Sequence, residues 1–156
     1  MNFDDLQGEK SYRKWGAYGQ SKLANLLFTY ELQRRLTDLD TDTIAVAAHP
    51  GWAATNLQTG GRGIDKGIGL KMNNLANAVI AQSDEMGALP TLYAATAAGV
   101  TGGGYYGPGG FMELKGLPKA VPSTPRSHNT DDARRLWDIS EELTGVTFDT
   151  LAGRNS

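Results

Sequence analysis

The sequence contains no cysteine and only two histidines, His49 and His128. The absence of cysteine excludes a disulfide scaffold and any thiolate metal site. Two histidines this far apart are too few for an ordinary zinc cluster, so no metal site is expected. The chain also opens on polar residues without an apolar export signal, and these absences together predict a cytoplasmic location.

The sequence also lacks an excess of charge of one sign. Its 156 residues carry 15 Lys and Arg against 17 Asp and Glu, a formal net charge of −2. This near balance argues against a nucleic-acid-binding surface. Apolar stretches are short and interrupted, well below the ~20 residues of a membrane-spanning helix. We therefore expect neither a nucleic-acid partner nor a membrane partner, although 40% hydrophobic residues suffice for a core.

Glycine, by contrast, is abundant, with 20 residues. This is nearly twice the usual ~7%, and it implies tight turns or a close approach of backbone to a ligand. Several of these glycines lie in residues 57–83, which have no regular pattern. We interpret residues 57–83 as a substrate-binding loop, because irregular segments of this length usually have a function. The alternative is a mobile surface excursion.

The first half of the chain predicts a helix followed by a buried strand. Residues 17–37 place apolar side chains on two stripes, one containing Phe28 and the other Leu27. Such a helix would be buried against a sheet on one side and a neighbouring helix or a second subunit on the other, so it could mediate homo-oligomerisation. The continuous apolar run at 43–48 is typical of a strand buried on both faces of a parallel sheet.

The second half of the chain predicts two further helices with short strands between them. Ser83 caps the first of these helices, which runs to about Ala98. Asn129 or Thr130 caps the last helix, over residues 131–143. The elements expected between the helices are short strands at 104–106 and 111–114 and an extended connection over 118–127.

Tyr18 and Lys22 stand four residues apart near the start of the first predicted helix. This spacing places both side chains on one face, one turn apart. A phenol is a poor proton donor or acceptor at neutral pH, but a neighbouring ammonium group stabilises the phenolate. The pair is therefore a candidate general acid/base for a carbonyl or hydroxyl group. Taken alone the pair is a weak signal, because Tyr-x-x-x-Lys arises by chance in many chains.

Further motifs surround this pair in a fixed order. Tyr18-Gly19-Gln20-Ser21-Lys22 lies within WGAYGQSKLANLLFTYELQRRL, and Pro50-Gly51-Trp52-Ala53-Ala54-Thr55 lies within AAHPGWAATNL. The chain then ends with RRLWDISEELTG shortly before Phe148. With these residues the sequence resembles the short-chain dehydrogenase/reductase family, in its retinol-dehydrogenase-like and protochlorophyllide-reductase-like branch. The resemblance extends from about Phe3 to Phe148.

The resemblance implies an NAD(P)-dependent oxidoreductase that transfers a hydride between nicotinamide and a small-molecule carbonyl or secondary alcohol. It implies that Tyr18 is the catalytic acid/base and that Lys22 holds the nicotinamide ribose and supports Tyr18. Both residues would thus also contact the cofactor, for which NADP is preferred over NAD.

The resemblance also assigns roles to the segment that follows the predicted strand. Pro50, Gly51 and Ala53 would let backbone approach the nicotinamide carboxamide. The Thr55 hydroxyl would bond the carboxamide or a phosphate, and residues 57–83 would close over the substrate. His49, between the strand and Pro50, is expected to fill space and bond a backbone carbonyl rather than relay protons.

The fold implied is α/β, the C-terminal part of a Rossmann-like doubly wound parallel sheet with a substrate-loop excursion. Residues 1–156 would form the C-terminal catalytic and substrate half of a single Rossmann-like domain. The family's glycine-rich turn and catalytic serine would precede Tyr18, and the only serine there, Ser11, lies too near to it. We therefore expect the 156 residues alone to be inactive. The alternative is a non-catalytic fragment or interaction module whose doubly apolar helix is a docking surface.

Overall fold

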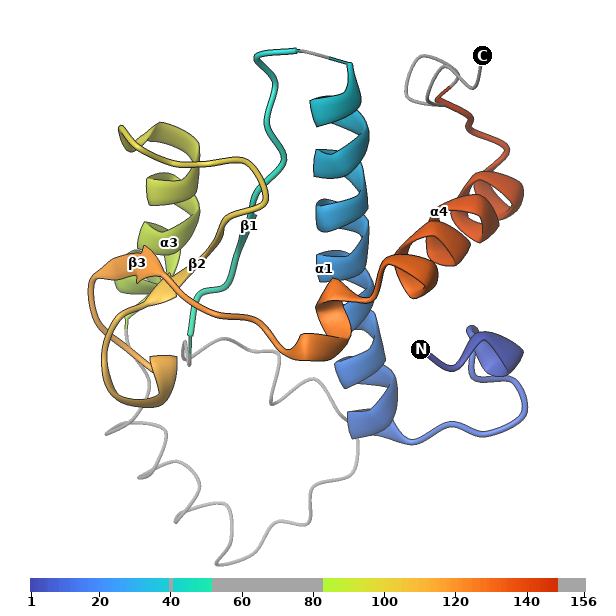
Figure 1. Cartoon of the computed structure of the whole chain (residues 1–156). Helices are drawn as coiled ribbons and strands as arrows, with labels where there is room; N and C mark the ends of the chain where they lie inside the picture. The colour runs from blue at the N-terminus through green and yellow to red at the C-terminus, as the bar shows by residue number, and fades with distance from the viewer. Residues whose placement is uncertain (40, 52–82, 149–156) are drawn as a thin grey trace, which may run out of the picture. The chain divides into compact units, whose positions relative to one another are not determined.

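The computed structural model describes residues 1–39, 41–51 and 83–148 (Figure 1). They fall into two compact units. The first takes its residues from Met1–Ala47, Thr101–Gly104 and Ser123–Ser156. The second takes them from Ala48–Val100 and Tyr105–Pro122.

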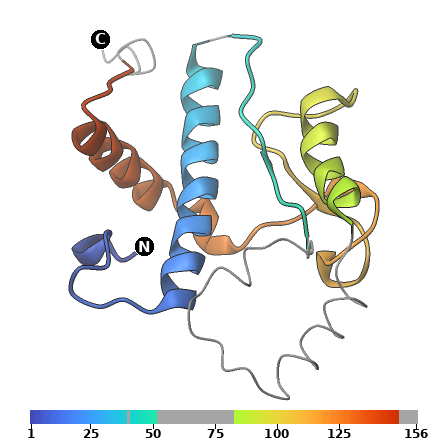
Figure 2. The same ribbon diagram turned by 180° about the vertical axis from the view of Figure 1, so that it is seen from behind.

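Two helices form the first unit, α1 over Lys14–Asp38 and α4 over Thr130–Thr144. They pack side by side, and the amino-terminal segment with the short 3-10 helix η1, Phe3–Asp5, packs against them (Figures 1 and 2). Leu27 of α1 is fully buried and contacts Ala133 and Leu136 of α4. The helix predicted at 17–37 is confirmed, with a start three residues earlier.

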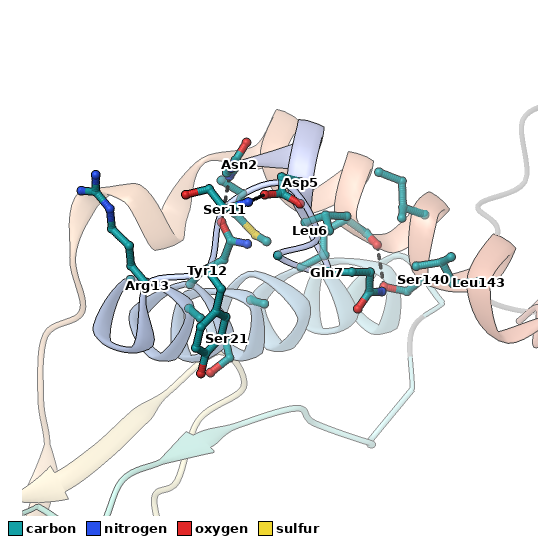
Figure 3. A pocket seen from close by; sticks show the side chains of 18 residues that line it. Asn2, Asp5, Leu6, Gln7, Ser11, Tyr12, Arg13, Ser21, Ser140 and Leu143 are labelled. Atoms are coloured by element: carbon teal, nitrogen blue, oxygen red, sulfur yellow. Dashed lines mark hydrogen bonds between the residues drawn. The ribbon is translucent and has the colours of Figure 1, made fainter. Parts of the chain in front are cut away.

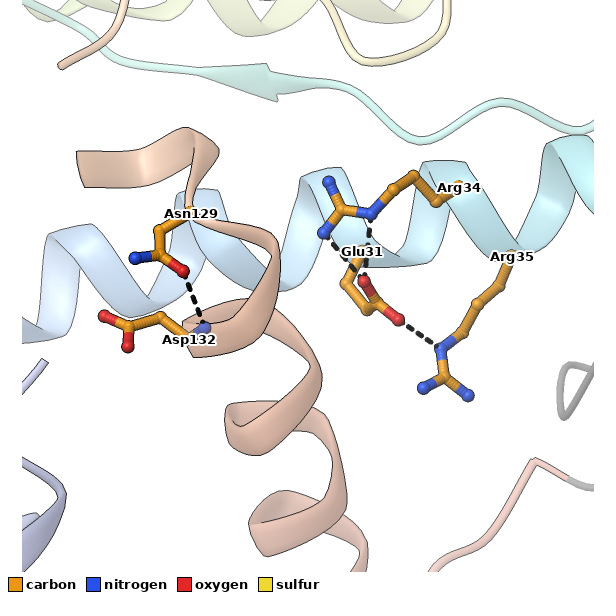
Figure 4. Close-up of polar contacts among 5 residues, drawn as sticks. All are labelled: Glu31, Arg34, Arg35, Asn129 and Asp132. Atoms are coloured by element: carbon orange, nitrogen blue, oxygen red, sulfur yellow. Dashed lines mark hydrogen bonds and ion pairs between the residues drawn. The ribbon is translucent and has the colours of Figure 1, made fainter. Parts of the chain in front are cut away.

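Local signals set both ends of α4. The Asn129 side-chain oxygen accepts a hydrogen bond from the Asp132 N–H at 2.9 Å, an N-cap (Figure 4). Asp131 and Asp132 lie in the first turn, where negative charge stabilises a helix. The helix ends at Gly145, whose φ of +66° suits a residue without a side chain. The predicted final helix and its Asn129 cap are confirmed.

A buried carboxylate and a buried indole add to the contact between these helices. The Glu31 carboxylate accepts hydrogen bonds from Arg34 at 2.7 Å and from Arg35 at 2.9 Å (Figure 4). The Arg35 guanidinium also lies 4.3 Å above the centre of the Trp137 ring, and Phe28 stacks on the same ring at 5.0 Å. The positive charges of Arg34 and Arg35 compensate the burial of the Glu31 carboxylate, because a buried carboxylate without a partner costs a large desolvation free energy.

The strand predicted at 43–48 is wrong in its extent, because β1 covers only Ala47–Ala48. Ile44 is 45% exposed, so this segment is not buried on both faces. The Ala45 N–H donates to the side-chain oxygen of Gln33 at 2.8 Å instead of to a neighbouring strand. A Cβ at Gly102 would collide with the same Gln33 amide. At the Ala45 N–H a glutamine of α1 thus takes the place of a strand partner, while the Ala45 oxygen accepts from the Gly103 N–H at 2.8 Å.

The described strands form a sheet in the order β1-β2-β3, with β2 at Tyr105–Pro108 and β3 at Pro118–Ala120. Ala47 N–H donates to Gly104 O and His49 N–H to Tyr106 O, each at 2.9 Å, so β1 and β2 are parallel. β2 and β3 are antiparallel, with Tyr106 opposite Ala120. The fold is therefore mixed α/β, and the expected parallel pairing holds for β1 and β2, whereas β3 departs from it because it is antiparallel to β2.

The connection between β2 and β3 also differs from the prediction. The predicted strand at 111–114 is instead the 3-10 helix η3, Phe111–Glu113, and β3 lies in the predicted extended connection 118–127. Met112 and Glu113 have φ of +51° and +57°, which no strand residue adopts. The turn closes with Gly110 N–H donating to Lys115 O at 3.0 Å.

Helix α3, Asp84–Thr96, packs on β2 and β3 in the second unit. The Ser83 hydroxyl accepts from the Met86 N–H at 3.3 Å, which confirms the predicted cap and the predicted helix to within two residues. No helix in the described ranges combines the length and the apolar character that crossing a bilayer requires.

Replacing Leu27 with alanine should lower the free energy of unfolding by about 2–5 kcal/mol, because a fully buried side chain leaves a cavity between α1 and α4. The matched control is Leu143→Ala in α4, where the leucine is 64% exposed and the expected change is within ~0.5 kcal/mol. Urea unfolding of the two variants measures both values. Equal losses would contradict the position of Leu27 in the core.

Candidate functional site

The structure brings Tyr18 and Lys22 together, as their spacing predicts. The Lys22 Nζ lies 5.3 Å from the centre of the Tyr18 ring. Tyr18 is 45% exposed and Lys22 is exposed as well. Both therefore stand on an open face of α1, where a ligand can reach the phenol oxygen and the ammonium group together.

Two neighbours hold the first turns of α1 around this pair. The Ser21 hydroxyl donates to the Tyr18 backbone oxygen at 2.8 Å, so the Ser21 hydroxyl proton is engaged within the helix. The Trp15 ring meets the Tyr18 ring edge to face, with centroids 6.4 Å apart. The Trp15 ring thus contacts the Tyr18 ring from the side, while Tyr18 remains 45% exposed.

Pro50 and Gly51 belong to the second unit, where they follow β1. Gly51 has a φ of +70°, and a Cβ there would lie 2.6 Å from both Leu114 O and Pro108 Cγ. The absent side chain thus makes room for the chain's own residues, and glycine is required here whether or not a cofactor approaches. Trp52, Ala53, Thr55 and the loop residues 57–82 lie outside the described residues.

His49 is bonded differently from the sequence expectation. Its Nδ1 accepts a hydrogen bond from the Gly51 N–H at 3.2 Å, so it bonds a backbone donor and not a carbonyl. Its Nε2 lies 3.3 Å from the Glu113 Oε2, at ion-pair distance but without hydrogen-bond geometry. Burial lowers the pKa of His49 below the ordinary 6.5, and Glu113 opposes part of this shift.

A pocket of about 490 Å³ lies in the first unit (Figure 3). It is lined by the amino-terminal segment, by one stripe of α1 and by the end of α4; Leu6, Ala17, Ser21 and Ile139 are typical members. Tyr18 and Lys22 are not among its lining residues. The pocket therefore lies on a different face of α1 from the candidate acid/base pair.

Sequence reasoning did not find a hydroxyl network between α1 and the 3-10 helix η4, Pro125–His128. Tyr30 donates to the Ser123 Oγ at 2.8 Å, and the Ser123 Oγ also lies 2.7 Å from the Ser127 Oγ and 2.8 Å from the His128 Nε2. Ser127 gives its proton to Thr124 O, so Ser123 donates to Ser127. No sequence signal links Tyr30 to residues 93 positions away.

The proton count in this network decides whether Ser123 and His128 form a nucleophile and base. Since the Ser123 proton goes to Ser127, the His128 Nε2 must donate to Ser123 and cannot accept from it. A general base needs the opposite arrangement. The network is therefore structural. In the described ranges, no group of three or more acidic and histidine side chains could hold a metal ion.

Comparison with known proteins extends this description. No family model matches the chain. Human retinol dehydrogenase 14 is 40% identical over 149 residues, which are 94% of this chain and 40% of that protein. Human retinol dehydrogenase 12 is 34% identical over 148 residues, and human polyprenol dehydrogenase is 34% identical over 152 residues. These matches cover 94% and 97% of this chain and 42% of each relative.

A solved structure agrees with these sequence matches. The crystal structure of an uncharacterized protein from Mycobacterium paratuberculosis is 38% identical, with a TM-score of 0.70 over 94% of this chain and 46% of that one. The resemblance to the short-chain dehydrogenase/reductase family is confirmed: the chain is homologous to part of its retinol dehydrogenases. The chain spans about two fifths of the length of these curated relatives.

Replacing Gly51 with alanine should destabilise the protein more than the same change at Gly99. Both glycines belong to the second unit and have positive φ, +70° and +84°, but a Cβ at Gly99 meets nothing within 4 Å. We expect Gly99→Ala to cost about 1 kcal/mol from backbone strain, and Gly51→Ala about 1–3 kcal/mol more from the collision with Leu114 and Pro108. Urea unfolding curves of the two variants give the comparison. Equal unfolding midpoints would contradict the close contacts on the Cβ side of Gly51.

Proposed function

We propose that this chain is the C-terminal part of a Rossmann-like, NAD(P)-dependent oxidoreductase. The enzyme would move a hydride between nicotinamide and a small-molecule carbonyl or alcohol. The observation that carries the proposal is the exposed Tyr18–Lys22 pair, 5.3 Å from Nζ to ring centre, in a chain homologous to dehydrogenases.

Tyr18 is the general acid/base on this proposal. When a carbonyl is reduced, the phenol donates its proton to the carbonyl oxygen, and when an alcohol is oxidised the phenolate accepts the alcohol proton. The Lys22 ammonium, one turn further along α1, stabilises the phenolate through its positive charge. The nicotinamide supplies or accepts the hydride when it is bound.

The residues present fit such a cofactor on the side of α1. The Lys22 ammonium is exposed and has three N–H donors for ribose hydroxyls. Pro50, Gly51 and Ala53 are proposed to face the carboxamide, and Thr55 to bond the carboxamide or a phosphate, with NADP preferred over NAD. On this proposal the 156 residues alone are inactive, because the dinucleotide-binding half of the enzyme lies in other sequence.

The substrate class is proposed from the names of the relatives. Retinol and polyprenol are alcohols on long hydrocarbon chains. A panel of apolar alcohols and the matching aldehydes is therefore the first choice for activity assays, with residues 57–83 proposed to close over the substrate. We further propose a cytoplasmic enzyme that can form homo-oligomers through α1.

An interaction module is the second candidate function. Two aromatic side chains near the start of α1, Tyr12 just before the helix and Trp15 in its first turn, are 70% and 73% exposed. Large exposed aromatic side chains are typical of protein interfaces. A module of this kind would bind a partner through α1. Its binding would not depend on the Tyr18 hydroxyl, whereas the activity of the proposed enzyme would.

Replacing Tyr18 with phenylalanine in the dehydrogenase polypeptide that contains this chain should lower kcat by about 10²-fold or more. Cofactor affinity should stay nearly unchanged, because only one hydroxyl is removed. The control is Tyr12→Phe, the same change at a more exposed tyrosine, which should keep full activity. Steady-state kinetics with a cofactor titration measure both. A Tyr18→Phe enzyme that kept more than about a tenth of its turnover would exclude Tyr18 as the general acid.

A further inference from the structure

Residues of the second unit surround the His49 imidazole on several sides. The ring lies beside Tyr105, with centroids 5.1 Å apart. A Cβ at Gly107 would collide with the imidazole, so the glycine of β2 leaves the space that the ring fills. Nδ1 accepts the Gly51 N–H, and the Glu113 carboxylate lies 3.3 Å from Nε2, at ion-pair distance.

The turn that carries Glu113 has an unusual backbone. Met112 and Glu113 both adopt positive φ, which is strained for residues with side chains. The Glu113 carbonyl lies on the Cβ side of Gly51, while the Glu113 carboxylate lies 3.3 Å from His49. One strained residue thus contacts both ends of the segment from His49 to Gly51. Strain of this kind persists where the surroundings impose it, and it gathers at functional sites.

The proton positions on His49 follow from its partners. Since Nδ1 accepts the Gly51 N–H, the neutral ring carries its proton on Nε2, directed towards the Glu113 carboxylate. A doubly protonated ring would have no lone pair for Gly51. The hydrogen bond that holds the turn therefore exists only while His49 is neutral.

We infer that His49 is the positioning residue of the Pro50–Gly51 turn, and that the Glu113 carboxylate, 3.3 Å from Nε2, acts on the ring through its charge. The inference rests on the proposed function, in which this turn faces the nicotinamide carboxamide. His49 acts through Gly51 and contacts neither substrate nor cofactor. Its role is to hold the Gly51 backbone at φ of +70°, so that the turn is formed before the cofactor binds.

The inference gives a pH dependence with a definite sign. The pKa of folded His49 is lowered by burial, so protons bind more weakly to the folded than to the unfolded chain. The stabilisation of the turn is complete above pH 6.5 and is lost as the pH falls through the lowered pKa of the folded state. Among the described residues, Glu113 is the charged group that acts on the ring, and it opposes the shift.

The Gly51 amide reports the hydrogen bond directly in ¹⁵N-labelled protein. We expect the Gly51 amide shift to titrate with the ring signals of His49 between neutral and acid pH. In His49→Asn this titration should vanish, because an asparagine oxygen can accept the same N–H two residues on without titrating. Glu113→Gln should move the midpoint to lower pH, since it removes the charge that favours the protonated ring. His128→Asn is the matched control and should leave the Gly51 profile unchanged.

A nicotinamide titration of the dehydrogenase polypeptide that contains this chain provides the second readout. Wild-type affinity should fall roughly three- to tenfold on acidification, the effect of about one hydrogen bond, and the affinity of His49→Asn should not change with pH.

A Gly51 amide shift that does not change as His49 titrates overturns the inference, even if nicotinamide binds. A titrating Gly51 amide without nicotinamide binding in any variant supports the hydrogen bond and overturns the proposed function. If His49→Asn fails to fold, the midpoint shift in Glu113→Gln still decides, because an unmoved midpoint overturns the part assigned to Glu113.

Discussion

The burial of Leu27 against α4 fixes how α1 is turned about its own axis. Tyr18 stands nine residues before Leu27, which at 3.6 residues per turn is about two and a half turns, so the two side chains point to opposite sides of the helix. The same spacing separates Lys22 from the buried Glu31. Packing α1 on α4 with Leu27 and Glu31 inward therefore directs Tyr18 and Lys22 outward. The exposure of the candidate acid/base pair is therefore a consequence of the core contacts on the opposite side of α1.

A second constraint acts in the other unit, on the backbone after β1. Gly51 can take its left-handed conformation because it has no side chain, and the carbonyls of Glu113 and Leu114 occupy the place where one would be. Packing within the first unit exposes the Tyr18–Lys22 pair. Packing within the second unit shapes the turn after β1.

The sequence predicted the parts of the fold that local signals determine. The three long helices and two of their caps, at Ser83 and Asn129, depend on spacing and capping residues within a few positions. The strand predicted at 43–48 is shorter than expected, because the Ala45 N–H bonds the Gln33 side chain of α1 and not a neighbouring strand. The turn with positive φ at Met112 and Glu113 also depends on distant contacts, which neither periodicity nor composition reports. The Tyr18–Lys22 pair was predictable from its spacing, whereas the approach of His49 to Glu113 joins residues that lie far apart in the sequence.

The central claim is that an ammonium group beside Tyr18 binds a nicotinamide nucleotide. The most direct measurement compares the affinities of Lys22→Met and Lys14→Met for reduced nicotinamide nucleotide, in the longer enzyme of which the proposed function makes this chain a part. Lys14 is a close control, because its Nζ lies 5.5 Å from the Trp15 ring centre on the same helix, much as Lys22 lies beside Tyr18. The account predicts that Lys22→Met weakens binding roughly 10- to 100-fold, the effect of losing a charged hydrogen bond, and that Lys14→Met does not. Equal affinities for the two variants would contradict it.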